Sequence, residues 1–227
     1  MTRQEVRAWI EETGVIAAVR ERSLENAMFA AEAVTVSGIR VVEISLTVPQ
    51  ATSVITRLSK NVPGIVVGAG SVTNAETARQ CIDSGAQFLT SDGFHPAVIE
   101  FASRNGVVVI PGTLTPTEVL NAWETNSDFV KVVPCAQLGG QVYIASLHAM
   151  FPHIPLIASG GVDQQSASKM IQAGAIGLGV GRELIPGEAV RLRQSARIAE
   201  LARRFLDFVK SGRAHLAAHT RRSSVGD

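Results

Sequence analysis

Residues 129–134, FVKVVP, have the pattern of a short β-strand that is apolar on both faces. Such strands are typical of parallel sheets that are covered by helices on each side. Lys131 interrupts this strand at its centre, where burial either costs an unpaired ammonium several kcal/mol or favours its neutral form. The position therefore indicates a lysine with a partner or a reactive amine.

Seven other short apolar runs resemble this one in length and in their β-branched residues. They are VIAAVR (15–20), VVEIS (41–45), IVVGAG (65–70), FLTS (88–91), VVVIPG (107–112), LIASGG (156–161) and IGLGVG (176–181). Helical segments separate the runs, and glycines expected to end helices precede several strands, at Gly14, Gly38, Gly85, Gly106 and Gly174. Eight β–α units in 227 residues favour an α/β fold of the (β/α)₈ TIM-barrel type over an open doubly wound sheet.

Further signals mark where helices begin and where the domain ends. Capping-box spacing occurs in three pairs, Thr2 with Glu5, Thr73 with Glu76, and Thr115 with Glu118. A helix over 2–13 is expected to cap the bottom of the barrel, because Val6, Trp9 and Ile10 share one helical face. We expect one domain over 1–210, a last helix over about 188–210, and a mobile tail over 211–227.

Composition narrows the class of partner. The net charge is +1, and apart from the tail the basic residues are mixed with acidic ones, which argues against nucleic acid. No apolar run reaches the ~18 residues of a membrane span, and two cysteines give no disulfide framework. The five histidines lack the spacing of metal ligands, and no cofactor is indicated. We expect a cytoplasmic protein that acts on a small molecule.

Two residues in separate strands carry the expected chemistry. Active sites of TIM barrels lie at the carboxyl ends of the strands. Side chains alternate along a strand, so Lys131 shares a face with Phe129, and Glu43 shares a face with Val41. If these faces point inward, Lys131 can form a Schiff base with a ketone while Glu43 transfers protons. The alternative is a buried Lys131–Glu43 ion pair that only joins two strands.

Glycine-rich turns predict a site for an anion. ASGGV (158–162) and GVGREL (179–184) end the seventh and eighth strands, where barrels often bind phosphate. Gly160, Gly161 and Gly181 would let the backbone approach the ligand, and Arg182 would add donors. Glycines that serve only tight turns are the alternative.

Two further strand ends offer ligands for an anion. Arg20 ends the first strand and is a candidate clamp, with a salt bridge at the rim as the alternative. Ser71 in GAGS (68–71) is a candidate ligand for a carboxylate, with a simple turn as the alternative.

Taken together, the motifs identify a family resemblance. They are VVEISLTVP (41–49), VVGAGSV (66–72), IPGTLTPTE (110–118), VKVVP (130–134), ASGGV (158–162) and GVGREL (179–184). In this order they resemble the 2-keto-3-deoxy-6-phosphogluconate (KDPG) and 4-hydroxy-2-oxoglutarate (KHG) aldolase family, over roughly residues 10–210. The resemblance implies a metal-independent class I aldolase, usually a homotrimer, that cleaves a 2-keto-4-hydroxy acid to pyruvate and an aldehyde. The first expectation is the phosphorylated six-carbon acid, which gives glyceraldehyde 3-phosphate, with 4-hydroxy-2-oxoglutarate as a second substrate.

The same resemblance implies roles for single residues. Lys131 stands where the Schiff-base lysine stands, and Glu43 where the general acid/base stands. Arg20 matches an arginine near the substrate anions. Ser71 replaces the usual threonine at the pyruvate carboxylate and keeps its hydroxyl. Gly160 and Gly161 match the phosphate turn.

This sequence also departs from the family pattern. Thr47 stands where some members have arginine, and Asp92 replaces a proline that usually lines the pocket. Val133 replaces a frequent phenylalanine, and Arg182 replaces a common serine at the phosphate. Asp92 would repel an anionic substrate if it faced the site, whereas Arg182 would attract one. The open alternatives are another phosphate-binding barrel, an isomerase or decarboxylase, and a trimeric barrel without catalytic activity.

Overall fold

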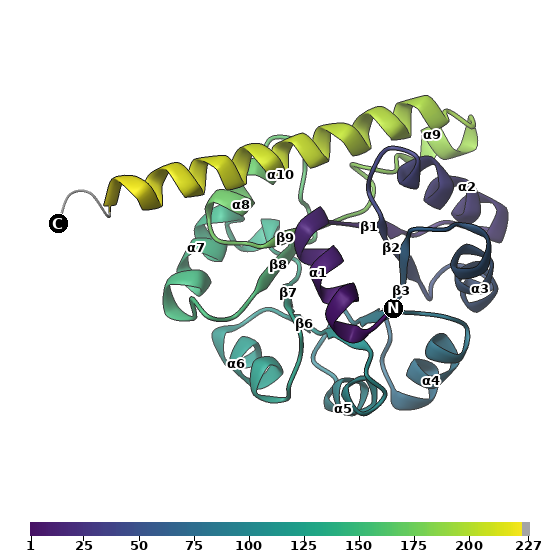
Figure 1. Ribbon diagram of the computed structural model, residues 1–227, viewed down its shortest axis with the longest axis horizontal. Coiled ribbons are helices and arrows are strands. Elements are labelled where there is room, and N and C mark those ends of the chain that lie inside the picture. Colours follow the sequence, from purple (N-terminus) through teal and green to yellow (C-terminus); the bar gives the residue numbers. More distant parts are fainter. Residues whose placement is uncertain (224–227) are drawn as a thin grey trace.

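The computed structural model describes residues 1–223 and shows parallel strands that form a barrel inside a ring of helices (Figure 1). The strands are β1 (Val15–Val19), β2 (Val41–Ser45), β3 (Val66–Gly70), β4 (Phe88–Thr90), β5 (Val108–Ile110), β6 (Gly112–Thr113), β7 (Val130–Val132), β8 (Leu156–Ser159) and β9 (Gly177–Val180). The expected (β/α)₈ barrel is confirmed.

The barrel closes at a broken strand. The order of strands is β5-β4-β3-β2-β1-β9-β8-β7-β6, so the two ends of the sheet are neighbours in sequence. β5 lies within the predicted run at 107–112, and β6 begins at the last residue of that run. Pro111 separates the two strands because proline has no N–H to donate. The Lys131 N–H donates to the Pro111 carbonyl at 2.9 Å, and Gly112 pairs with Lys131. One run of sequence therefore forms both edges and completes the barrel.

The helices of the ring alternate with the strands (Figure 1). They are α2 (Leu24–Thr35), α3 (Ala51–Asn61), α4 (Ala75–Asp83), α5 (Pro96–Arg104), α6 (Pro116–Glu124), α7 (Gln141–Met150) and α8 (Ala167–Gln172), with a 3₁₀ turn η1 (Ala136–Leu138) after β7. Capping boxes form at Thr2 and Thr115 as predicted. The one expected at Thr73 is wrong, because Asn74 caps α4 by accepting from the Thr77 N–H at 2.8 Å.

Helix α1 (Arg3–Thr13) crosses the amino-terminal end of the barrel (Figure 1). Val6 and Ile10 are buried, and Trp9 is partly buried, against apolar side chains that point into the barrel. These inward side chains are Ile16, Val41, Val66, Phe88, Val108, Ile110, Phe129 and Ile157. The predicted cap is confirmed, and it seals this end with an apolar plug.

The carboxyl-terminal part differs from the expectation. The helix expected over 188–210 is two helices, α9 (Gly187–Arg191) and α10 (Ser195–Ser223), separated by a turn in which Arg193 has φ of 53°. Helix α10 packs along α2 and α8 and extends past the barrel (Figure 1). The predicted helix end near 210 is wrong, because 211–223 continue α10. Residues 224–227 of the expected tail lie outside the described residues.

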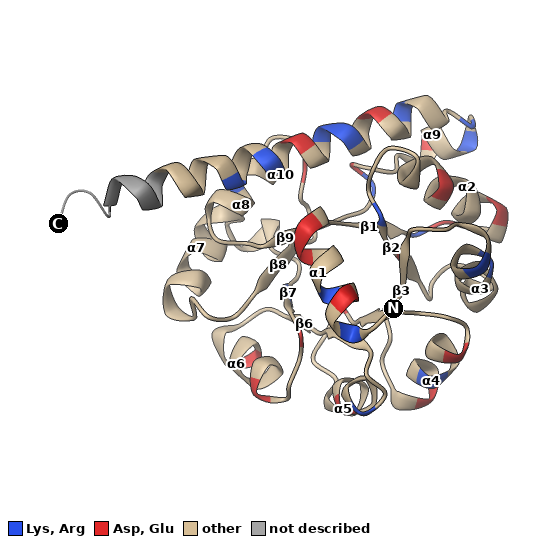
Figure 2. Ribbon diagram, viewed as in Figure 1, with Lys and Arg blue, Asp and Glu red and all other residues tan. Residues whose placement is uncertain are grey.

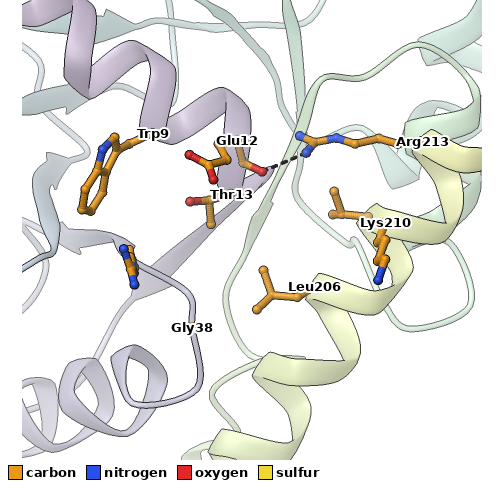
Figure 3. Close-up of a pocket in the computed structure, with 9 residues that line it drawn as sticks. Trp9, Glu12, Thr13, Gly38, Leu206, Lys210 and Arg213 are labelled. Carbon is orange, nitrogen blue, oxygen red and sulfur yellow. Dashed lines mark hydrogen bonds between the residues drawn. The ribbon is translucent and has the colours of Figure 1, made fainter.

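Arg213 joins the extended α10 to the end of α1. Its guanidinium donates to the Glu12 carbonyl at 2.8 Å (Figure 3), and also to the Ile176 carbonyl at 3.1 Å and to the Glu11 carbonyl. The last carbonyls of a helix lack partners within the helix, so this arginine satisfies the end of α1. The hollow of about 520 Å³ that Figure 3 shows lies between α1 and α10.

Charge and hydropathy add two observations. Basic and acidic residues alternate along part of α10 and occur on α2, α3, α4, α5 and α6, whereas α7 carries none (Figure 2). Among the helices of the described residues, none combines the length and the apolar character that a membrane crossing needs.

Candidate active site

The candidate site lies one layer above the apolar plug. Side chains alternate along a strand, so the residue two positions after each plug residue also points into the barrel. Phe88, Phe129 and Val41 of the plug are followed in this way by Thr90, Lys131 and Glu43. All three polar residues are buried, and the exposed fraction of Lys131 and of Glu43 is 4%. The structure thus places Lys131 and Glu43 inside the barrel mouth.

Thr90 connects the two residues. Its hydroxyl donates to Glu43 Oε2 at 2.9 Å, and Lys131 Nζ lies 3.5 Å from the same hydroxyl oxygen. Among the described residues, the carboxylate that forms an ion pair with Lys131 is Asp92, so the structure does not show the direct Lys131–Glu43 pair considered above. A hydroxyl between an amine and a carboxylate is a suitable path for a proton.

Two glycines make room for polar side chains of neighbouring strands: Gly70 for Glu43, and Gly179 for Ser159. A Cβ atom on Gly70 would lie 2.1 Å from Glu43 Oε1, and one on Gly179 would lie 2.7 Å from Ser159 Oγ. Contacts below 3.0 Å force one partner to move. Glycine at 70 therefore leaves the space that the Glu43 carboxylate occupies.

Asp92 lies at the centre of a cluster of donors. Its carboxylate accepts from Lys131 Nζ at 3.0 Å, from Ser71 Oγ at 2.9 Å, and from Arg20 Nη2 at 3.3 Å to each oxygen. Burial raises the pKa of Asp92, but the charge and hydrogen bond of Lys131, the hydrogen bond of Ser71 and the charge of Arg20 outweigh it and bring the pKa to about 2. Asp92 is therefore ionised at neutral pH and faces the site.

Hydroxyl groups extend the cluster toward β2. Ser45 Oγ lies 2.9 Å from Thr47 Oγ1 and 3.3 Å from Ser71 Oγ. Thr47 thus lies next to the cluster through Ser45 and contributes a neutral hydroxyl there.

The glycine turns that follow β8 and β9 line the same cavity as Lys131, and this cavity has a volume of about 550 Å³. Gly160 and Gly161 have φ of 80° and 82°, and a Cβ on Gly160 would lie 2.7 Å from Pro134 Cα. Gly181 and Arg182 line the cavity as well. For Gly181 no packing reason is found, because the nearest atom to an added Cβ is the Ala18 carbonyl oxygen at 3.6 Å.

Sequence reasoning missed three polar residues of the site. Thr90 ends a strand of three residues, and its place on the same face as Phe88 was the available signal. Ser45 has the same relation to Glu43, and Gln137 lines the cavity from η1. The neighbouring Cys135 thiol is buried, and burial raises its pKa to about 11, which makes it a poor nucleophile.

The chain is similar to proteins of known function and structure. A 2-dehydro-3-deoxy-6-phosphogalactonate aldolase of Escherichia coli (strain K12) is 31% identical over 185 residues, which cover 78% of this chain and 86% of the relative. A 2-keto-3-deoxy-6-phosphogluconate aldolase structure of Zymomonas mobilis ZM4 with 3-phosphoglycerate has a TM-score of 0.82 and 26% identity, covering 90% of this chain and 96% of that one.

A designed protein is also similar. It is a cube-shaped, highly porous cage made by fusing symmetric oligomeric domains, with a TM-score of 0.84 and 28% identity over 94% of this chain and 78% of that one. The family model described as KDPG and KHG aldolase matches residues 6–201, most of the described chain. The relatives and the barrel fold agree with this match. The chain therefore belongs to the KDPG and KHG aldolase family of lyases.

Proposed function

We propose that this protein is a class I aldolase that cleaves 2-dehydro-3-deoxy-6-phosphogluconate to pyruvate and glyceraldehyde 3-phosphate through a Schiff base on Lys131. The observation that carries the proposal is the buried Lys131 Nζ, joined through Thr90 to Glu43 in one cavity. Residues 1–210 would form the aldolase domain, and no cofactor or metal takes part in the proposed steps.

The chemistry follows from the two side chains. The neutral amine of Lys131 attacks C2 of the 2-keto acid, and the C2 oxygen leaves as water to give an iminium. Glu43 takes the proton of the C4 hydroxyl, the C3–C4 bond breaks, and its electron pair forms an enamine while C4 becomes the aldehyde. Glu43 returns the proton to C3, and water then hydrolyses the iminium to pyruvate and free Lys131. Thr90 holds the Glu43 carboxylate toward this path.

Different parts of the cavity lining suit the two ends of the substrate. Arg20 and Ser71 share the Asp92 carboxylate with Lys131, and they lie where the carboxylate beside C2 would bind. Gly160, Gly161 and Gly181 with Arg182 line the cavity after β8 and β9 and would receive the phosphate. A cavity of about 550 Å³ has the size of ordinary small-molecule sites.

The proposal includes a cytoplasmic homotrimer. Support for self-association comes from Val142 and Met150 on α7, which have exposed fractions of 66% and 50%, and from the designed cage, whose building blocks are symmetric oligomers. Sedimentation of the purified protein tests the trimer. Cytoplasmic location rests on the two unpaired cysteines, Cys81 and Cys135.

The Schiff base is tested by trapping. Pyruvate and borohydride should add a reduced pyruvate group to Lys131, detected by mass spectrometry of the digested protein. Lys131→Met should abolish both the adduct and aldolase activity and still give a folded barrel, because methionine fills the same apolar strand. A wild-type protein that gains no adduct at saturating pyruvate contradicts the proposal.

The substrate is tested by pyruvate release from three acids. These are 2-dehydro-3-deoxy-6-phosphogluconate, its galactonate epimer at C4, and unphosphorylated 4-hydroxy-2-oxoglutarate. We expect the highest kcat/KM with the gluconate compound. Preference for the unphosphorylated acid would refute the phosphate site, and preference for the galactonate compound, named in one relative, would correct the stereochemistry.

A further inference from the structure

We propose that Asp92 is an internal competitor for the substrate carboxylate: it occupies the donors that would bind this group, and it must leave them before a 2-keto acid can bind. This inference rests on the proposed function, because it assumes that Lys131 attacks the ketone beside that carboxylate.

The contacts of Asp92 carry the inference. Its two oxygens accept from the amine of Lys131 at 3.0 Å, the hydroxyl of Ser71 at 2.9 Å and the guanidinium of Arg20 at 3.3 Å. These are the donors near Lys131 that a carboxylate one bond from the reacting ketone would use. Asp92 therefore offers them the same chemical group, a carboxylate, in the absence of substrate.

Electrostatics make simultaneous binding unfavourable. A substrate carboxylate beside Lys131 would lie next to the ionised Asp92, and like charges at such distances repel strongly. Thr47 offers no compensating cation, since it carries a neutral hydroxyl that hydrogen-bonds to Ser45. Substrate binding thus requires Asp92 to turn away rather than to share its partners.

The backbone around Asp92 permits this motion of the side chain alone. Ser91 Oγ donates to the Gly93 carbonyl at 2.7 Å, and a Cβ on Gly112 would lie 2.5 Å from the Asp92 carbonyl carbon. The loop is therefore held closely against β6. The side chain itself is 43% exposed, so a change of rotamer can carry the carboxylate toward solvent.

The inference gives Asp92 a role in specificity. Pyruvate has one anionic group and must displace Asp92 with no other charge contact. A phosphorylated substrate also contacts the glycine turns and Arg182, and this added binding offsets the displacement. Asp92 should therefore weaken the binding of pyruvate, and with it inhibition by this product.

The experiment measures the pyruvate concentration that gives half the maximal rate of borohydride trapping. We expect Asp92→Asn and Asp92→Ala to lower this concentration by roughly 10-fold to 100-fold, the effect of a charge-assisted hydrogen bond on affinity. Glu183→Gln is the matched control, because it removes a carboxylate of the same cavity, whereas the ion pair of Lys131 among the described residues is with Asp92. It should change the concentration less than about twofold. Thermal unfolding verifies that each variant is folded.

Three outcomes separate the possibilities. Equal half-saturating concentrations in wild type and both Asp92 variants would overturn the inference and leave the Schiff base intact. Unchanged half-saturation with a large loss of turnover in Asp92→Asn would also overturn it, because Asp92 would then act on the reacting atoms. If no variant and no wild-type protein is trapped, the proposed function itself fails.

Discussion

The two ends of the barrel interior differ although the same strands build both. At the amino-terminal end, residues such as Phe88, Phe129 and Ile10 exclude water completely. Two residues further along the strands, Thr90 and Lys131 carry polar groups that face a cavity. The difference teaches that one step of strand alternation separates the part that stabilises the fold from the part that does chemistry.

This separation predicts that each end can be damaged alone. Substitutions in the polar layer should reduce activity at nearly constant stability. Substitutions in the plug should reduce stability at nearly constant activity per folded molecule.

The largest effect is expected from Gly70→Ala. The added methyl group would lie within 2.1 Å of Glu43 Oε1 and would displace the carboxylate from Thr90. We expect kcat to fall by about 10²-fold to 10⁴-fold, the usual contribution of a general acid/base. Gly187→Ala is the control, since nothing lies within 4 Å of its added Cβ and its activity should be unchanged. Full activity in Gly70→Ala would show that the Glu43 carboxylate does not need its contact with Thr90 for catalysis.

Ile10→Ala should break the plugged end instead. The side chain is 1% exposed, and truncation of a buried isoleucine costs about 2–5 kcal/mol in the free energy of unfolding. Urea denaturation measures this loss, and kcat per folded molecule should stay the same. Gln4→Ala on the exposed side of α1 should change the free energy by less than about 0.5 kcal/mol. A loss of kcat in Ile10→Ala would mean that the two ends are coupled.

Arg213→Ala should have a smaller effect on the plug. It leaves carbonyls of Glu11 and Glu12 at the end of α1 without a charged donor, which costs about 1–3 kcal/mol. The change should appear as a lower midpoint of denaturation and as faster amide exchange in α1. Arg203→Ala, an exposed position of the same helix, is the control. Equal stability of the two variants would contradict the role assigned to Arg213.

Acid should reveal the smallest effect, at the polar end. The pKa of Asp92 is lowered from 3.8 to about 2, so its ion pairs add stability that is fully present above pH 3.8 and lost as the pH falls through 2. Because the side chain is 43% exposed, solvent screens this contribution. Between about pH 4 and pH 2, the free energy of unfolding of Asp92→Asn should therefore fall slightly less steeply than that of the wild type. If the free energy of unfolding fell equally with pH in Asp92→Asn and in the wild type, the ion pairs assigned to Asp92 would be contradicted.

The sequence predicts the fold better than the details of the site. Runs of β-branched residues and glycines at helix ends repeat often enough to indicate the barrel, and the alternation within FVKVVP places Lys131 inside it. The partner of Lys131 is not predictable in this way. Asp92 follows β4 in a loop, and the direction of a loop side chain depends on contacts such as that between Gly112 and the backbone of Asp92.

The length of α10 was missed for a related reason. Residues beyond 210 lack an apolar stripe, which is the signal that predicts a packed helix. Their attachment depends on the apolar side chain of Leu216, which packs against the core, together with close backbone approach and one polar group. A Cβ on Gly212 would lie 2.7 Å from Ile171 Cβ, and Arg213 binds carbonyls rather than side chains. Such contacts leave no periodic trace in the sequence.

The hydrogen bond from Arg213 to Glu12 also bears on the order in which the chain folds. The two residues are 201 positions apart, so a chain growing on the ribosome synthesises α1 long before the arginine that binds its end. Closing so long a loop costs entropy that only the finished barrel can offset. Until α10 emerges, Gly14 caps α1 but the Glu11 and Glu12 carbonyls lack this guanidinium, so a chain shortened before residue 213 would carry a less stable first helix as well as a shorter last one.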